Sequence, residues 1–221
     1  MKIRKGKQSG TLDNAVFVNN KYGQVVRSRP HRQSRKTSAR LRCQASCSNQ
    51  ARRWRNLSDG RQAAWRAVAG QCRCRSAGEE DVKLSGCQLF VKINCALAAV
   101  RLEPVLEPPK PVKFGPNPVK RLVIRNEQGR ITLELELAKA PAAYIVVRGS
   151  PPCSRGILVR SNYSTIGLLT APVRGHNEIT AFYVERFGVP PVGSCVFIRT
   201  RQMIGGWEDD FKDISAVVPR G

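Results

Sequence analysis

A change in hydrophobic period divides this chain and limits the folds that it can adopt. Upstream, apolar residues recur at helical spacing, whereas Ile131–Leu137 alternates strictly with polar residues, as in a strand with one buried face. Between these parts, six prolines fall within residues 104–118. Such a run cannot stay helical and favours extended polyproline-type structure. The pattern predicts a helical part, a proline-rich linker and a β part, in that order.

The first helix is expected to begin at an N-cap, Thr37 or Ser38, and to end near Arg55. Spacings of four, four and three residues place one apolar stripe along it, formed by Cys43, Cys47, Ala51 and Trp54.

Two further helices are expected before the prolines. Ser58 is a suitable cap for a helix from Asp59 to about Ala69, with Gly70 as its stop. The third is expected to start after Ser85 and to reach about Val100.

Residues 14–29 have the pattern of a β-hairpin. Two short β-prone runs, 15–18 and 24–26, flank a loop of residues that tolerate positive φ. We expect a flexible basic arm before it, and Pro30 ends the second strand.

The chain after the prolines is expected to contain short antiparallel strands at 121–125, 131–137, 144–148, 157–160, 165–169, 179–185, 195–200 and 214–218. This number of strands in about 110 residues indicates a β-sandwich of the immunoglobulin or fibronectin type III class. The Cys…Trp…Cys pattern of true immunoglobulin domains is absent, which favours the fibronectin-like variant. The fold class is therefore α+β and multidomain, with a basic arm and hairpin at 1–36, a helical region at 37–103, the linker at 104–118 and the sandwich at 119–221.

Positive charge is concentrated at the start of the chain. Residues 1–75 hold nineteen Lys and Arg against two acids, Asp13 and Asp59, which is +17 of the total formal charge of +22. A segment so one-sided repels itself unless it settles on a polyanion, an acidic surface or an assembly. Arg dominates over Lys, as bidentate phosphate recognition favours. The candidate binding residues are Arg27, Arg29, Arg32, Arg35, Lys36, Arg40, Arg42, Arg52, Arg53 and Arg55.

The eight cysteines are interpreted as structural residues, with Cys43 and Cys47 as small core side chains. The alternatives are a zinc site that joins Cys43-x₃-Cys47 to Cys72-x-Cys74, whose spacing fits poorly, and a Cys153–Cys195 disulfide. We predict no metal site and no cofactor.

Catalysis has little support in the sequence. The two histidines are His31 and His176, and neither belongs to a recognisable nucleophilic motif. Glu134 and Glu136 are expected to project to solvent, and residues 208–213 are interpreted as an acidic turn. The protein is therefore predicted not to be an enzyme.

Three segments carry a resemblance to a known family: Val26-Arg27-Ser28-Arg29-Pro30, the Trp54–Trp65 element with Gln62-Ala63-Ala64-Trp65, and Leu84-Ser85-Gly86 leading into a helix with Leu89-Phe90-Val91 and Asn94. The layout resembles an uncharacterised family of small bacterial and phage proteins with an N-terminal hairpin arm, a helical middle and a C-terminal fibronectin-like domain. The resemblance implies an association with phage-like structural and surface proteins.

These observations favour a structural subunit that works by assembly, as part of a phage-like particle or filament. Its basic half is expected to dock on an acidic partner or on nucleic acid. The alternative is a nucleic-acid-binding protein attached to a ribonucleoprotein or to packaged DNA. The start of the sequence lacks the apolar core of a secretory signal, and no stretch has the length of a membrane span. The expected location is the cytoplasm or a particle, without a membrane partner.

Overall fold

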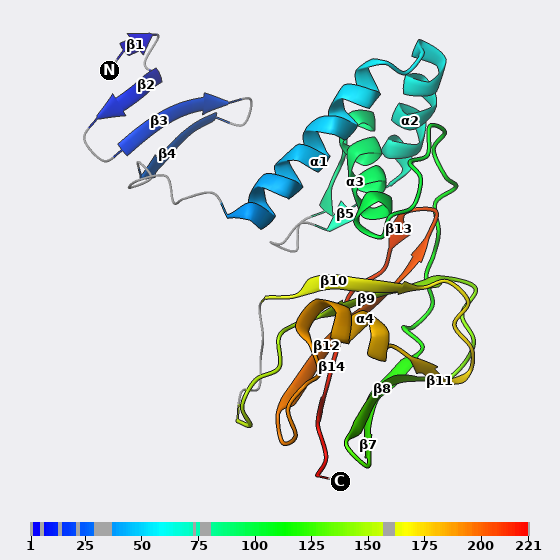
Figure 1. Ribbon diagram of the computed structural model, residues 1–221. Helices are drawn as coiled ribbons and strands as arrows, with labels where there is room; N and C mark the ends of the chain where they lie inside the picture. The colour runs from blue at the N-terminus through cyan, green and yellow to red at the C-terminus, as the bar shows by residue number, and fades with distance from the viewer. Residues whose placement is uncertain are drawn as a thin grey trace. The chain divides into compact units, whose positions relative to one another are not determined.

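The computed structural model describes residues 2–4, 7–12, 15–20, 23–28, 37–72, 74–75, 81–156 and 162–220. The chain forms two compact units, residues 1–45 and 46–221, and the boundary falls within helix α1 (Ser38–Arg55). The described residues contain four helices together with antiparallel sheets, so the fold is a mixture of α and β structure (Figure 1).

The first unit holds a four-stranded antiparallel sheet in the order β1-β2-β3-β4. Its strands are β1 (Lys2–Arg4), β2 (Lys7–Leu12), β3 (Ala15–Asn20) and β4 (Gly23–Ser28). The predicted hairpin is confirmed by the pairing of β3 with β4, from Ala15 opposite Ser28 to Asn20 opposite Gly23. The prediction of a flexible arm before it was wrong, because β1 and β2 extend the same sheet.

The second unit begins with α1's C-terminal half, followed by α2 (Asp59–Gln71) and α3 (Gly86–Ala99). The first two predicted helices are confirmed, although α2 continues one residue past Gly70. The third helix has a full capping box. The Gln88 backbone N–H donates to Ser85 Oγ (3.2 Å), and the Ser85 backbone N–H donates to Gln88 Oε1 (2.8 Å). A minor strand pair, β5 (Cys74–Arg75) with β6 (Asp81–Val82), lies between α2 and α3 in the sequence.

The helices bury a core of their own. Trp65 of α2 and Phe90 of α3 are completely buried, and their rings meet edge to face with centroids 5.2 Å apart. Val146 and Met203 belong to the same cluster, so α2 and α3 pack on part of one sheet face.

The proline-rich segment 104–118 is fixed by two tryptophan side chains that donate to its backbone carbonyls. Trp65 Nε1 donates to the Leu106 carbonyl (2.8 Å), and Trp207 Nε1 donates to that of Pro109 (3.3 Å). Indole N–H groups need a partner when buried, and the extended segment supplies carbonyls that no helix uses. The segment therefore lies against the second unit as a strap.

The β part consists of two antiparallel sheets. One has the order β10-β9-β12-β13, with β14 also paired to β12, and the other has the order β11-β8-β7. The strands are β7 (Val119–Glu127), β8 (Arg130–Leu137), β9 (Tyr144–Gly149), β10 (Ser164–Leu169), β11 (Gly175–Glu178), β12 (Cys195–Ile204), β13 (Trp207–Glu208) and β14 (Lys212–Val217).

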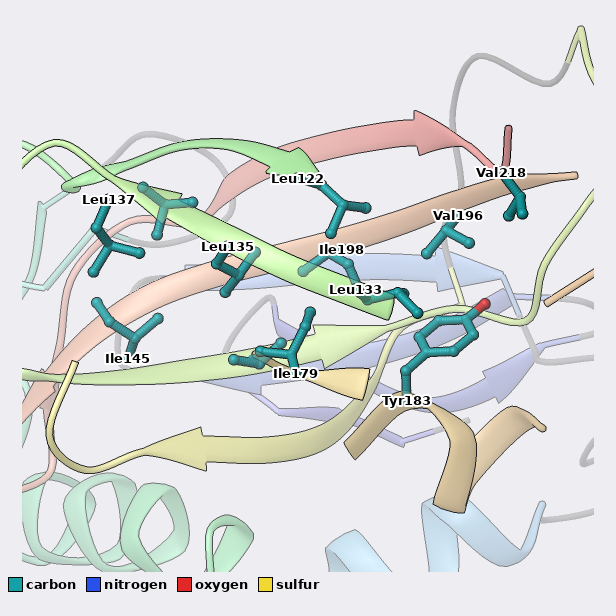
Figure 2. Close-up of a cluster of buried hydrophobic side chains, with 12 residues drawn as sticks. Leu122, Leu133, Leu135, Leu137, Ile145, Ile179, Tyr183, Val196, Ile198 and Val218 are labelled. Atoms are coloured by element: carbon teal, nitrogen blue, oxygen red, sulfur yellow. The ribbon is translucent and has the colours of Figure 1, made fainter. Parts of the chain in front are cut away.

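A shared core joins the two sheets. The alternation in β8 buries Leu133, Leu135 and Leu137 against Ile145 of β9 and Ile198 of β12 (Figure 2). These contacts establish a two-sheet packing, but an immunoglobulin-like sandwich is not confirmed.

One predicted strand was wrong. Residues 179–185 fall largely in helix α4 (Thr180–Phe187), which ends at Gly188 with a φ of 77°. The buried Tyr183 points into the sheet core (Figure 2), and its ring contacts Phe187, one turn along the helix, with centroids 5.2 Å apart. Tertiary burial of this face outweighs the local β propensity of the sequence. The predicted strand at 157–160 lies outside the described residues.

Candidate polyanion interface

Helix α1 places a row of arginines at a defined spacing. It begins after Thr37, whose Oγ1 accepts a hydrogen bond from the Arg40 backbone N–H (3.3 Å) and whose carbonyl accepts one from Leu41 (3.0 Å). Thr37 thus performs the predicted capping role. The last turn is basic, with Arg52, Arg53 and Arg55, which complements the partial negative charge of a helix C-terminus.

The five predicted α1 residues are all exposed. They are Arg40, Arg42, Arg52, Arg53 and Arg55. Among the described residues, no acidic side chain forms an ion pair with any of them. From Arg40 to Arg55 the helix rises by about 22 Å, at about 1.5 Å per residue. Duplex DNA presents one phosphate per about 1.7 Å of axis, so this length spans several phosphates.

Some arginines elsewhere in the second unit have acidic partners. Five of them lie within 3.3 Å of a carboxylate oxygen in ion pairs: Arg61 with Glu107, Arg121 with Glu136, Arg125 with Glu134, Arg199 with Asp213 and Arg201 with Glu208. Within the described ranges, acids thus pair with one arginine of α2 and with four of the β part, whereas the five α1 arginines have no such pair. The α1 arginines are therefore candidates for an external polyanion.

The other predicted binding residues cannot be compared in this way. Arg27 is part of β4, and only its backbone is described. Arg29, Arg32, Arg35 and Lys36 lie outside the described residues.

Sequence reasoning missed a second basic feature, here called the arginine–aromatic cluster, formed by Arg148, Arg199, Arg201, Tyr163 and Phe211. The guanidinium carbons of Arg201, Arg199 and Arg148 lie 4.3, 5.1 and 5.4 Å from the Phe211 ring centroid. Arg199 also lies 4.4 Å from that of Tyr163. The alternation Arg199-Thr200-Arg201 was a signal that both arginines share one strand face.

Acids balance much of the charge in this cluster. Arg199 donates from both Nε and Nη2 to Asp213 (2.5 and 2.7 Å), and Arg201 Nη2 lies 2.6 Å from Glu208 Oε1. Burial lowers the pKa of Arg201 and raises the pKa of Glu208. Residues 208–213, predicted as an acidic turn, connect β13 to β14, and Glu208 and Asp213 in this segment bind arginines. The cluster is mainly an internal network.

The remaining candidates do not converge on a catalytic or metal site. His176 Nδ1 lies 3.0 Å from Glu134 Oε2 on the face of β8 opposite the leucines, so its partner is a carboxylate and not a cysteine. Glu134 and Glu136 share that face as predicted, but neighbouring basic side chains cover most of their surface. Across the described part of the chain, no three His, Cys, Asp or Glu side chains are grouped as metal ligands.

The cysteines divide into different environments. Cys43 is exposed, which corrects its prediction as a core residue, whereas Cys153 and Cys195 are buried free thiols. Each of these two donates its backbone N–H to the other's carbonyl (3.1 and 2.8 Å), and the Cys153 thiol points to the Cys195 carbonyl (3.7 Å). Burial raises the pKa of Cys195. A Cys153–Cys195 disulfide is therefore not present.

Comparison with protein-family models, with curated proteins and with solved structures gave no significant match. None of the helices in the described ranges combines the length and the apolar character needed to cross a bilayer.

Proposed function

We propose that this protein is a non-enzymatic assembly subunit whose basic N-terminal half docks on a polyanion. The observation that carries this proposal is the set of exposed α1 arginines without acidic partners among the described residues. Five positively charged guanidinium groups in one helix repel one another, and a polyanion would relieve this repulsion. The proposal includes display of the β part as a rigid module of the fibronectin-like class.

A triple substitution with a charge-matched control tests the docking. Arg52→Gln/Arg53→Gln/Arg55→Gln removes unpaired arginines, and Arg61→Gln/Arg121→Gln/Arg125→Gln removes the same charge from residues in ion pairs. Binding of each full-length chain to a fluorescent DNA duplex of random sequence is titrated at several salt concentrations. Each lost phosphate contact lowers the slope of log K against log salt by about 0.9, so the α1 variant is expected to lose roughly 2–3 in slope. The control is expected to keep the wild-type slope. Equal slopes in both variants would refute docking through α1.

Assembly is supported by the N-terminal sheet. Among the described residues, β4 pairs only with β3, and its Val26 side chain is 58% exposed. An outer strand with an exposed apolar side chain can accept a strand from a neighbouring subunit. Sedimentation of the wild type and of Val26→Lys, with and without DNA, tests this: the wild type is expected to form larger species that the variant does not. A wild type that stays monomeric under both conditions would overturn the assembly role.

The second candidate function is nucleic-acid binding without assembly, as part of a ribonucleoprotein or of packaged DNA. The length of the α1 row favours it, since it matches several duplex phosphates. It predicts steep salt dependence for DNA together with a monomer at all protein concentrations. An acidic protein partner in place of nucleic acid predicts a shallow slope for DNA in the wild type.

A further inference from the structure

Two thiols meet where α1 crosses α3. The Sγ atoms of Cys47 and Cys95 lie 3.8 Å apart, and the Cys95 thiol points to the Cys47 sulfur. Ser46 Oγ donates a further contact to Cys95 Sγ at 3.6 Å. Both cysteines are half-buried. The two thiols are thus in direct contact without being joined by a disulfide.

The surrounding packing holds the two thiols in register. Seven residues after Cys47, the Trp54 ring packs on Phe90, with centroids 5.7 Å apart, and Phe90 precedes Cys95 on α3. Along α1, Cys47 comes before Trp54, whereas on α3 the partner of Cys47, Cys95, comes after the partner of Trp54, Phe90. The two helices are therefore antiparallel here. A disulfide needs an S–S distance of about 2.05 Å, so the sulfurs must approach by about 1.8 Å. Rotation of the cysteine side chains and a small shift of α1 can provide this.

Four of the other cysteines are placed differently. The Cys153 thiol is directed at a carbonyl oxygen, and Cys195 is buried. Cys43 lies one turn before Cys47 on α1 and is exposed, while Cys87 lies two turns before Cys95 on α3. These last two serve as internal controls, because each shares a helix with one member of the pair.

We propose that Cys47 and Cys95 form a reversible disulfide that clips α1 to α3, with a peroxide as the oxidant. One thiolate attacks the peroxide O–O bond and becomes a sulfenic acid, releasing one water after proton transfer. The second thiol attacks the sulfenyl sulfur, the S–S bond forms, and the hydroxyl leaves as a second water. Two thiols and one hydrogen peroxide thus give one disulfide and two waters. A small dithiol or glutathione reverses the reaction by thiol–disulfide exchange.

The clip has a mechanical consequence for the second half of α1. A covalent link at Cys47 fixes this segment to α3 one turn before Arg52. The oxidised protein is therefore expected to protect the backbone amides of residues 46–55 more strongly from hydrogen exchange. Any effect of the clip on DNA binding rests on the proposed function, whereas the disulfide and the amide protection do not.

Peptide mapping of the full chain tests the proposal. The reduced protein is exposed to hydrogen peroxide, its remaining thiols are alkylated, and it is digested with trypsin. Cleavage after basic residues puts Cys47 in the peptide 43–52, Cys95 in 93–101 and Cys87 in 84–92. The expected result is a linked pair of 43–52 with 93–101 that lacks two hydrogens and disappears after reduction. It is expected to persist in Cys43→Ser and Cys87→Ser, and to be lost in Cys47→Ser.

The wild-type protein alone can overturn the proposal, so the test does not depend on folding of the variants. Sulfinic acid on Cys47 or Cys95 without a linked peptide would refute it. So would a link that survives Cys47→Ser but not Cys43→Ser, because the exposed cysteine would then be the partner. A linked peptide without a change in amide protection would refute the clip. A linked peptide in a protein that does not bind DNA would count against the proposed function alone.

Discussion

Asn94 of α3 and Val105 of the proline-rich strap are joined by two reciprocal hydrogen bonds. The Val105 backbone N–H donates to Asn94 Oδ1 (2.8 Å), and Asn94 Nδ2 donates to the Val105 carbonyl (3.1 Å). The same Nδ2 also donates to the Phe90 carbonyl (3.1 Å), and Asn94 is completely buried. One amide side chain therefore performs for an extended segment the pairing that a neighbouring strand would perform.

Asn94→Ala is expected to lower the free energy of unfolding by about 2–6 kcal/mol, because the backbone N–H and carbonyl of Val105 lose their partners at about 1–3 kcal/mol each. Urea unfolding measures the loss. Asn49→Ala makes the same chemical change at an exposed position of α1 and is expected to stay within about 0.5 kcal/mol of the wild type. Equal stability of the two variants would show that Asn94 does not hold the strap.

Gly206, in the turn after β12, lies tightly against α3. A Cβ there would sit 2.5 Å from Ile93 Cγ2 and 3.0 Å from the Ile93 carbonyl oxygen. Gly129 has the same φ of 85°, but its Cβ would meet nothing within 4 Å. Gly129→Ala is expected to cost about 1–2 kcal/mol from backbone strain alone. Gly206→Ala is expected to cost about 1–3 kcal/mol more, because the new methyl group also overpacks the contact with α3. Urea unfolding measures both losses. If Gly206→Ala and Gly129→Ala lower the free energy of unfolding equally, the turn does not pack closely on α3.

The sequence predicted helices and strands well where the pattern is local. The boundaries of α1 follow from the Thr37 cap and the basic last turn, and those of β8 follow from strict alternation. The segment 179–185 was misread because its β-branched and aromatic residues suit both structures. Tyr183 and Phe187, four residues apart and followed by Gly188, were the available signal for a helix.

Long-range register could not be predicted. Arg199 stands opposite both Arg148 and Asp213, and the like-charged pair is stable only because the third strand supplies a carboxylate. Likewise, the contact of Cys47 with Cys95 depends on how α1 lies on α3, which no local pattern encodes.

The ion pair of Arg121 with Glu136 predicts a pH dependence. The hydrogen bond from Arg121 is the largest influence on the Glu136 carboxyl, and it lowers its pKa below the usual 4.5. The unfolded chain therefore binds more protons than the folded one between the two pKa values, so this group's stabilisation is present above the unfolded pKa and is lost as the pH falls through the folded pKa. In Arg121→Gln, the pKa of Glu136 measured by NMR titration is expected to rise.

The control for this titration is Arg125→Gln, which removes an equal charge from the partner of Glu134. It is expected to leave the pKa of Glu136 closer to its wild-type value than Arg121→Gln does. If both substitutions raise the pKa of Glu136 equally, the lowered pKa results from the nearby positive charge in general and not from the Arg121 hydrogen bond.

Phe211 provides a test of the arginine–aromatic cluster. Its ring is 40% exposed, with the Arg201 guanidinium carbon 4.3 Å from its centroid. Exposed cation–π contacts contribute about 0.5–1 kcal/mol each, so the loss of three such contacts in Phe211→Leu is expected to lower the free energy of unfolding by about 1.5–3 kcal/mol. Phe211→Tyr keeps the aromatic ring and is expected to change the free energy of unfolding by less than about 0.5 kcal/mol.

The comparison of the two Phe211 variants separates the ring's electrostatics from simple coverage of the strand. Leucine keeps the apolar character of the site but has no negative ring face to attract a guanidinium. If leucine and tyrosine prove equally stable, Phe211 acts only as an apolar cover, and the charges of Arg148, Arg199 and Arg201 are held by Asp213, Glu208 and the backbone alone.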